Sequence, residues 1–239
     1  MRLLQIPFSH NCVKVRHVLD LKGIPYETVN INPLWRPDVV RASRQTLVPV
    51  LVDGERSIAG STQILLHLEE RHPQPALLPA EPRERAECLL LIDWADAAFM
   101  ALSRRLAYHR VLEGPPKDLG GLFFPGQPER VRTVAGAGAG AGLRIRFGIT
   151  GRRIRADAAE ARRVAAIAVG RLGGADHLVG DELTLADITL ATMSSPLQYA
   201  GDEVTGDDAV RRLLEWDARI LGASFSPPRV TELADARAG

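Results

Sequence analysis

The sequence has few cysteines and no long uninterrupted hydrophobic segment. Cys12 and Cys88 are its only cysteines, which excludes the dense disulfide framework of a small secreted domain, and no zinc-type spacing of Cys and His accompanies them. We therefore expect a reducing, cytoplasmic location and no bound metal. The most apolar segment, residues 88–102, contains Asp93 and Asp96 and is shorter than the roughly 18 apolar residues that a membrane span needs. A buried helix is expected there, without membrane contact.

Neither sign of charge predominates. The chain has 30 Lys and Arg against 29 Asp and Glu, a formal net charge of +1, so no overall field favours a nucleic acid or an anionic membrane as partner. Residues 1–9 contain one basic residue and a short apolar run that stops at Pro7, which is too short for a signal peptide. The composition, 46% hydrophobic and 25% charged, is that of a globular protein with one large or two small domains.

The first 75 residues alternate segments typical of strands and helices. Strands are expected at 2–6, 26–31, 50–52 and 56–59, and helices after Ser9, at about 38–44 and at 62–71 with Ser61 as cap. A helix between the first two strands predicts a parallel pair, and the turn at Asp53-Gly54 predicts an antiparallel hairpin. Residues 1–75 are therefore expected to form an α/β domain with a mixed four-stranded sheet.

No strand pattern returns after a proline-rich linker between Pro73 and Pro82. Thr184 and Asp187 are spaced to form a capping box at one helix start. An all-helical domain over residues 83–235 is expected, with helical patterns at 83–112, 154–172, 185–197 and 207–221.

The segment from Glu113 to Arg155 fits neither pattern. Glycine alternates with alanine from Ala135 to Gly142, and each glycine costs about 1 kcal/mol in a helix relative to alanine. We expect a helix here only if neighbouring segments pack against it. The segment also carries eight Lys or Arg against three acids, which indicates either an anion-binding surface or a solvated charged face.

Three motifs resemble the cytosolic glutathione transferases, in particular theta- and zeta-like bacterial members. Ser9-His10-Asn11-Cys12 and residues 13–27 are similar to their first helix and second strand, Val48-Pro49 stands where the family has a cis proline, and residues 178–187 resemble the capping motif of their second domain. The resemblance covers most of the chain outside the glycine-rich segment. It implies a thioredoxin-like N-terminal domain followed by an all-α C-terminal domain, a homodimer, and glutathione as cosubstrate.

The resemblance implies that the hydroxyl of Ser9 activates the glutathione thiol. A hydroxyl donor and the positive end of a helix together lower a thiol pKa from roughly 8.5; otherwise Ser9 is only the helix cap. Cys12 resembles the second cysteine of a glutaredoxin motif that lacks the first, but it shares an apolar face with Val15 and Leu19 and is expected to be buried and inert. His10 is expected to tune the sulfur, to bind substrate or simply to be solvated.

The resemblance also implies two groups of binding residues. Gly60 replaces an acidic residue that would hold the glutathione amine, and Leu47 replaces a Lys or Gln that would hold the glycyl carboxylate; Arg36, Arg41, Arg44 or Gln45 are candidate substitutes. A small hydrophobic or anionic electrophile is expected between the domains, near Met100 and Arg104. The glutathione contacts implied are His10, Val48, Pro49, Gly60, Ser61 and Thr62, and the substrate-pocket residues implied are Arg105, Tyr108 and His109.

Three functions are compatible with these residues. The first is a glutathione transferase that performs conjugation, thiolytic removal of a leaving group or isomerisation. The second is a noncatalytic binding or scaffold protein with the same fold, which Gly60 and Leu47 favour because they remove polar contacts to glutathione. The third is a thiol-disulfide oxidoreductase that acts through Cys12.

Overall fold

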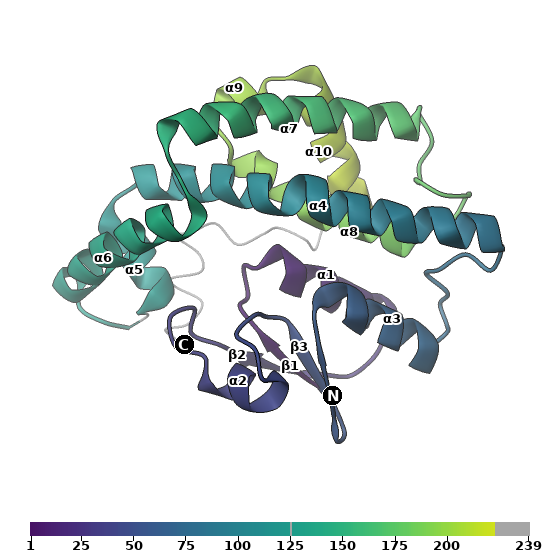
Figure 1. The fold of residues 1–239 in the computed structure, drawn as a ribbon, viewed down its shortest axis with the longest axis horizontal. Helices are drawn as coiled ribbons and strands as arrows, with labels where there is room; N and C mark the ends of the chain where they lie inside the picture. The colour runs from purple at the N-terminus through teal and green to yellow at the C-terminus, as the bar shows by residue number, and fades with distance from the viewer. Residues whose placement is uncertain (125, 223–239) are drawn as a thin grey trace.

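The structure, a computed structural model, describes residues 1–124 and 126–222. A four-stranded sheet with three helices forms one layer, and the remaining helices form a second layer above it in Figure 1. Residues 72–81 contain no helix or strand and join the two layers. The predicted fold class, a thioredoxin-like α/β part followed by an all-helical part, is confirmed. The predicted boundary at residue 235 lies outside the described residues.

The sheet has the predicted mixed pairing. Strand β1 pairs in parallel with β2 and antiparallel with β3, and β3 pairs antiparallel with β4. Successive residues of a strand point to opposite faces, so Leu3 joins the core shared with the helical layer and Leu4 joins a separate apolar cluster on the other face. The strand order is β2-β1-β3-β4, formed by β1 (Arg2–Gln5), β2 (Glu27–Asn30), β3 (Val50–Asp53) and β4 (Arg56–Ala59).

Three helices cover the sheet. On the face toward the helical layer lie α1 (His10–Leu21) and α3 (Ser61–Arg71), and on the other face lies α2 (Pro37–Ser43). Helix α1 begins at Ser9, whose carbonyl accepts hydrogen bonds from the N–H groups of Cys12 and Val13 at 2.8 and 2.9 Å. Helix α3 begins after Gly60, which has a φ of 93° and occupies the cap position. Ser61 is therefore the first helical residue, which corrects its expected role as the cap.

A fully buried helix lies at the centre of the helical layer. Every residue of α8 (Leu185–Ser194) is buried, because α1, α4 (Pro82–Glu113) and α10 (Asp208–Leu221) pack around it. The predicted capping box is present: the Asp187 carboxylate accepts hydrogen bonds from the N–H groups of Thr184 at 2.8 Å and Leu178 at 2.7 Å. The layer is completed by α7 (Gly151–Leu172), η1 (Ser195–Tyr199) and α9 (Asp202–Thr205).

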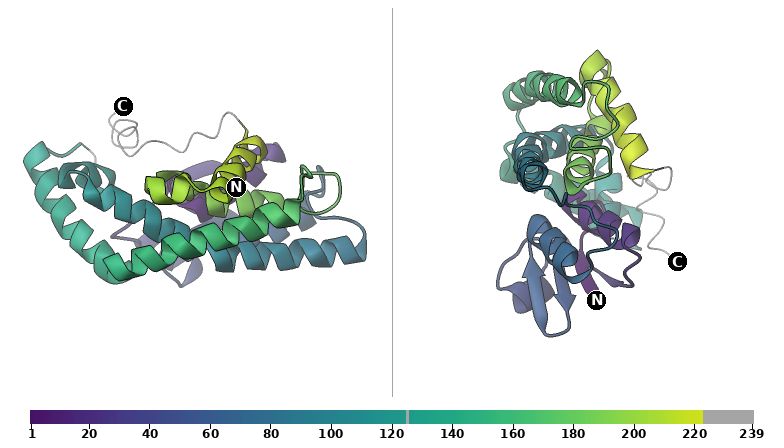
Figure 2. Two further views of the ribbon diagram at one scale, coloured as in Figure 1. Left: turned by 90° about the horizontal axis from the view of Figure 1, so that it is seen from above. Right: turned by 90° about the vertical axis from the view of Figure 1, so that its right-hand side faces the viewer.

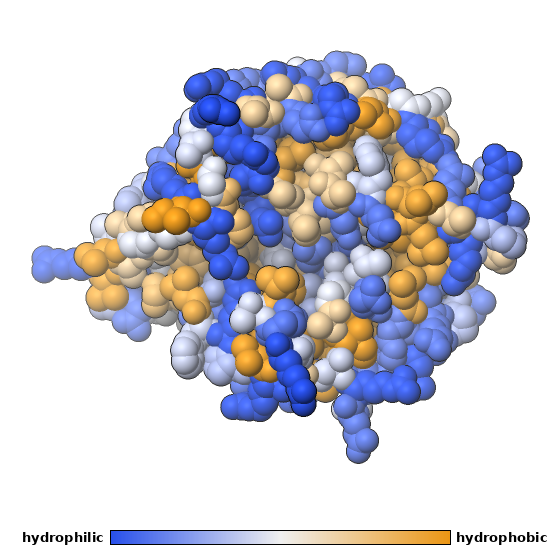
Figure 3. Space-filling model, viewed as in Figure 1, coloured by the Kyte–Doolittle hydropathy of each residue, from blue (hydrophilic) through white to orange (hydrophobic). Residues whose placement is uncertain are grey.

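The glycine-rich tract lies in a helical hairpin at one end of the molecule (Figure 2), formed by α5 (Pro116–Phe123) and α6 (Glu129–Phe147). A Cβ atom at Gly136 would overlap the carbonyl of Pro116, whereas Gly138 and Gly142 have no atom within 4 Å of that position. The tract is thus helical under the condition expected from the sequence, with a neighbouring helix packed against it. Orange side chains are visible at this end in Figure 3, where α6 exposes Val131, Val134 and Ile145.

Polar contacts join the two layers. The ammonium of Lys14, which is fully buried, lies 2.9 Å from the carboxylate of Asp96, and the Thr62 hydroxyl donates to the same carboxylate at 3.1 Å. The Asn11 amide donates to the sulfur of Met100 at 3.3 Å. These contacts fix the start of α1 against α4. Across the described part of the chain, none of the helices has the combined length and hydropathy of a membrane span.

Candidate functional site

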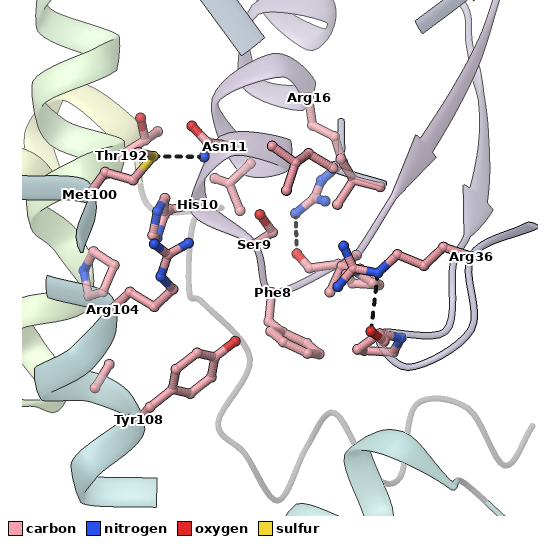
Figure 4. A pocket seen from close by; sticks show the side chains of 18 of the residues that line it. Phe8, Ser9, His10, Asn11, Arg16, Arg36, Met100, Arg104, Tyr108 and Thr192 are labelled. Carbon is pink, nitrogen blue, oxygen red and sulfur yellow. Dashed lines mark hydrogen bonds between the residues drawn. The ribbon is translucent and has the colours of Figure 1, made fainter. Parts of the chain in front are cut away.

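A cavity of about 1450 Å³ lies between the two layers. Its walls come from the start of α1, the loop that contains α2, the segment before β3, and helices α4, α6 and η1. Figure 4 shows its centre, with the start of α1 between Arg104 and Tyr108 on one side and Arg36 on the other. The volume exceeds the usual few hundred to 1000 Å³ of a site for one small ligand, so two molecules can be held together.

Ser9 lies in this cavity at the beginning of α1. Its backbone carbonyl starts the helix, but its hydroxyl makes no capping hydrogen bond. Ser9 therefore occupies the N-cap position of α1, as its alternative role predicts, but it caps the helix through its backbone and not through its hydroxyl. The first turn of the twelve-residue α1 also directs partial positive charge toward this point.

His10 is buried, with only 8% of its surface exposed, so the interpretation as a solvated residue is wrong. It lines the cavity beside Met100 and Arg104. Burial, with smaller contributions from the positive charges of Arg104 and Lys14, lowers the pKa of His10 to about 3. The imidazole is therefore neutral at physiological pH.

Cys12 is fully buried, as its shared face with Val15 and Leu19 predicts. Burial raises the pKa of its thiol to about 11, and hydrogen bonds involving Ile6 and Ser9 offset this only in part. A protonated thiol without solvent access is a poor nucleophile. The site therefore offers no chemistry for an oxidoreductase that acts through Cys12.

The Val48–Pro49 peptide bond is cis, as the resemblance implies. Val48 lines the cavity next to Leu47, which is 62% exposed, while Pro49 faces β4 and its carbonyl accepts from the Gly60 N–H at 3.3 Å. Arg36 lies nearby in the cavity wall. Its guanidinium is oriented by the carbonyls of Thr46 at 2.7 Å and Pro33 at 3.1 Å, which leaves its charge without a carboxylate partner among the described residues.

The start of α3 does not reach this cavity. The Ser61 hydroxyl donates to the side-chain oxygen of Asn11 at 3.1 Å, and the Thr62 hydroxyl is bound to Asp96. Pro49, Gly60, Ser61 and Thr62 are all absent from the cavity wall. Of the glutathione contacts predicted from the resemblance, the structure thus brings together His10 and Val48 around Ser9, and separates the group at the start of α3 from them.

On α4 the cavity is lined by Met100, Arg104, Ala107, Tyr108 and Val111. Met100, Arg104 and Tyr108 repeat every four residues and so share one face. Two of the predicted pocket residues are corrected by the structure. Arg105 points away and forms a two-pronged ion pair with Asp157 at 2.6 and 2.7 Å. His109 lies outside the cavity wall, 3.6 Å from Glu113.

The cavity is strongly basic, which the near-neutral net charge of the chain conceals. Its one acidic residue in the described structure, Asp20, accepts a hydrogen bond from the Tyr26 hydroxyl at 3.0 Å. Arg146 belongs to the basic segment 113–155, whose role the sequence left open. Of the described basic residues in that segment, Arg146 alone lines the cavity. The five arginines in the wall are Arg16, Arg36, Arg41, Arg104 and Arg146.

Comparisons with known proteins agree with this geometry. Residues 3–76 match the family model of the glutathione S-transferase N-terminal domain. A zeta-class glutathione S-transferase of Euphorbia esula is 39% identical over 84 residues, which cover 33% of this chain and 37% of that protein. Maleylpyruvate isomerase of a Ralstonia species is 34% identical over 116 residues, which cover 46% of this chain and 55% of that protein.

The match to curated relatives thus spans only about a third to about half of their length. The likeness to a solved structure is longer: a glutathione S-transferase from Rhodospirillum rubrum F11 aligns with 97% of this chain and 98% of its own, at 26% identity and a TM-score of 0.67. Residues 3–76 thus match a glutathione S-transferase N-terminal domain, and the described chain as a whole resembles a solved glutathione S-transferase in fold, with the mixed sheet, the cis proline and the capping box of α8 in place.

Proposed function

We propose that the protein is a glutathione transferase that activates the thiol of glutathione with Ser9 and transfers it to a small electrophile. The observation that carries this proposal is the position of the Ser9 hydroxyl, which lies in the cavity at the positive end of α1 without a capping bond to the helix. Conjugation, thiolytic removal of a leaving group and isomerisation all begin with the same activated sulfur. The similarity to maleylpyruvate isomerase supports including isomerisation.

The cavity residues fit two parts of glutathione. Ser9, whose side chain also interacts with the buried Cys12 thiol, borders the cavity where the sulfur would lie, and Val48 borders the same cavity. Leu47 cannot bind the glycyl carboxylate, because its side chain is apolar. Arg36, which is held nearby by two backbone carbonyls, provides the positive charge for that carboxylate instead. The γ-glutamyl end would have to be bound without the usual acid, since Gly60 stands there and Ser61 is bonded to Asn11.

Bound glutathione supplies the nucleophilic sulfur. The Ser9 hydroxyl donates a hydrogen bond to that sulfur, and the free N–H groups of the first turn of α1 add positive potential. Both interactions stabilise the anion more than the neutral thiol. Each unit by which they lower the thiol pKa corresponds to about 1.4 kcal/mol of preferential stabilisation of the anion.

The experiment that tests the proposal compares Ser9→Ala with Ser57→Ala, a matched change on the exposed side of β4. Absorbance of the thiolate near 240 nm during a pH titration reports the pKa of bound glutathione. We expect Ser9→Ala to raise this pKa by about 1 to 2 units and to lower turnover at pH 7 by about 10- to 100-fold, with little loss of glutathione binding. Full turnover in Ser9→Ala would refute the role of this hydroxyl.

The alternative, a noncatalytic binding or scaffold protein, is favoured by Gly60 and Leu47, which weaken contacts to glutathione. Thermal unfolding with and without millimolar glutathione separates the two. A ligand at 100 times its Kd stabilises the native state by about 2.7 kcal/mol, so an enzyme should show a clear shift. Absence of both the shift and turnover would favour the scaffold function.

We further propose that residues 1–75 and 83–235 are two domains and that the chain forms a cytoplasmic homodimer, as the family resemblance implies. Limited proteolysis within residues 72–81 should release two resistant fragments. Sedimentation velocity at micromolar concentration should give the mass of a dimer, and a monomer there would contradict the second proposal.

A further inference from the structure

Three buried nitrogen atoms in the cavity wall have no hydrogen-bond partner among the described residues: Nε2 of His17, Nε of Arg104 and Nε2 of His10. The last two lie on α4 and at the start of α1. Figure 4 shows the two side chains next to each other, between Met100 and Tyr108. Buried polar atoms are nearly always paired with protein, water or ligand, so these two atoms indicate a place where a bound molecule supplies the acceptor.

The surroundings of Arg104 are positive and uncompensated. Its guanidinium lies 4.9 Å from the centre of the Phe147 ring, and that of Arg146 lies 5.7 Å from the same ring. Tyr108 stacks on Phe147 with a centroid distance of 5.3 Å. Within the described structure no carboxylate pairs with either arginine. Both guanidinium groups lie over the Phe147 ring, and both residues line the cavity.

The next residue on α4, Arg105, differs from Arg104 because its charge is paired within the protein. Its guanidinium forms a two-pronged ion pair with Asp157, which joins α4 to α7. Burial lowers the pKa of Arg104, because nothing in the described protein neutralises its charge there. An anionic ligand would supply the missing charge.

We infer that Arg104 and His10 form a carboxylate-binding site for the second substrate, and that the protein therefore selects electrophiles that carry a carboxylate. This inference rests on the proposed function, since it concerns the molecule that receives the sulfur. Arg104 supplies the charge, Arg146 adds to it from α6, and His10 donates one N–H. Burial keeps the imidazole neutral, so it contributes a directional donor without adding a further positive charge.

The site is separate from the arginine assigned to glutathione. Arg36 lies across the cavity from Arg104 (Figure 4) and is held at the loop before β3. Ser9 lies between them. Glutathione bound with its sulfur at Ser9 therefore has Arg36 on one side for its glycyl carboxylate. On the other side, Arg104 is placed to bind the carboxylate of the electrophile. A neutral electrophile would leave Arg104 and His10 unpaired.

The test measures binding without glutathione, so that it does not depend on turnover. Isothermal titration calorimetry with 3-benzoylpropionate and its methyl ester compares an unreactive acid with its neutral counterpart. The variants are Arg104→Gln, His10→Leu, and Arg110→Gln as the control, which removes the same charge from the exposed side of α4 where Arg110 pairs with Glu113 at 2.8 Å. Turnover is then measured with 3-benzoylacrylate and its methyl ester in the presence of glutathione.

We expect the wild-type protein to bind the acid at least ten times more tightly than the ester. Arg104→Gln should weaken acid binding by about 10- to 100-fold, as expected for loss of a charge-assisted hydrogen bond, and His10→Leu by several-fold, while Arg110→Gln leaves it unchanged. Equal binding of acid and ester by the wild-type protein would overturn the inference without any variant. The inference would also be overturned if a folded Arg104→Gln variant bound the acid as tightly as the wild-type protein does.

The two proposals fail in different ways. Acid binding that depends on Arg104, without any glutathione-dependent turnover, would support the carboxylate site and refute the transferase. Turnover of the ester as fast as that of the acid, with no preference in binding, would support the transferase and refute the carboxylate site.

Discussion

Replacing Gly136 by alanine should destabilise the α5–α6 hairpin, whereas the same change at Gly138 should stabilise it. A Cβ at Gly136 would overlap the carbonyl oxygen of Pro116 and come within 2.8 Å of the backbone nitrogen of Gly120, and neither backbone atom can rotate away. Nothing lies within 4 Å of a Cβ at Gly138. Both positions are inside α6, so both substitutions gain the same helix propensity.

The two variants together isolate the cost of the close contact. Alanine is favoured over glycine by about 1 kcal/mol in a helix, and this gain cancels when the variants are compared. Forcing an extra carbon into a packed contact costs about 1 to 3 kcal/mol. Gly136→Ala should therefore be less stable than Gly138→Ala by about 1 to 3 kcal/mol, with α5 displaced from α6.

Urea unfolding followed by circular dichroism measures the difference in free energy, and amide hydrogen exchange locates it. Exchange in α5 and α6 should accelerate in Gly136→Ala and slow in Gly138→Ala, while the amides of α8 change little. Equal stabilities and equal exchange in the two variants would refute the idea that the glycine at position 136 exists to admit the Pro116 backbone.

Four further predictions concern three buried polar groups. Asp96→Asn should destabilise the fold by about 3 to 5 kcal/mol in thermal unfolding, because it leaves Lys14 buried without its counter-charge; the double variant Lys14→Met/Asp96→Leu should recover most of this, and a double variant no better than the single one would contradict the argument. Asp187→Ala should cost at least about 2 kcal/mol in denaturant unfolding, because it leaves two buried N–H groups unpaired, and a loss below about 0.5 kcal/mol would count against the capping box. Native Cys12 should react with iodoacetamide only after unfolding at neutral pH, because burial raises its pKa to about 11. Its raised pKa also predicts that stability falls as the pH rises from about 9 toward 11, since the unfolded chain then loses this proton first; rapid labelling of the native protein would refute both statements.

Most of the fold follows from local patterns. The hairpin at Asp53-Gly54, the capping box at Thr184 and the apolar face that buries Cys12 each depend on residues a few positions apart, and all three are present in the structure. For the glycine-rich tract, the sequence predicted a helix only on the condition that a neighbouring segment packs against it. Its formation depends on Pro116, a residue twenty positions away from Gly136, and glycine spacing alone does not specify which helix will approach.

The residues of the site could be predicted less well than the fold, because they depend on which side of each helix faces the cavity once the helices have packed. Ser9 and Tyr108 were named from the sequence and lie in the cavity, but Arg105 and His109 lie one residue beyond the cavity face of α4. The spacing of Met100, Arg104 and Tyr108 contained the signal for that face. It could not be read without knowing which side of α4 meets α1.

The sequence by itself determined the order of the four strands and of most helices, and it carried the family resemblance, because periodicity, caps and turns are properties of neighbouring residues. Only the tertiary structure decided which charges meet. Arg36, Arg104 and Arg146 come from three distant segments of a nearly neutral chain, and they face one cavity because α2, α4 and α6 are brought together around the start of α1. A positive cavity of this kind depends on long-range packing, which no short segment of the sequence contains.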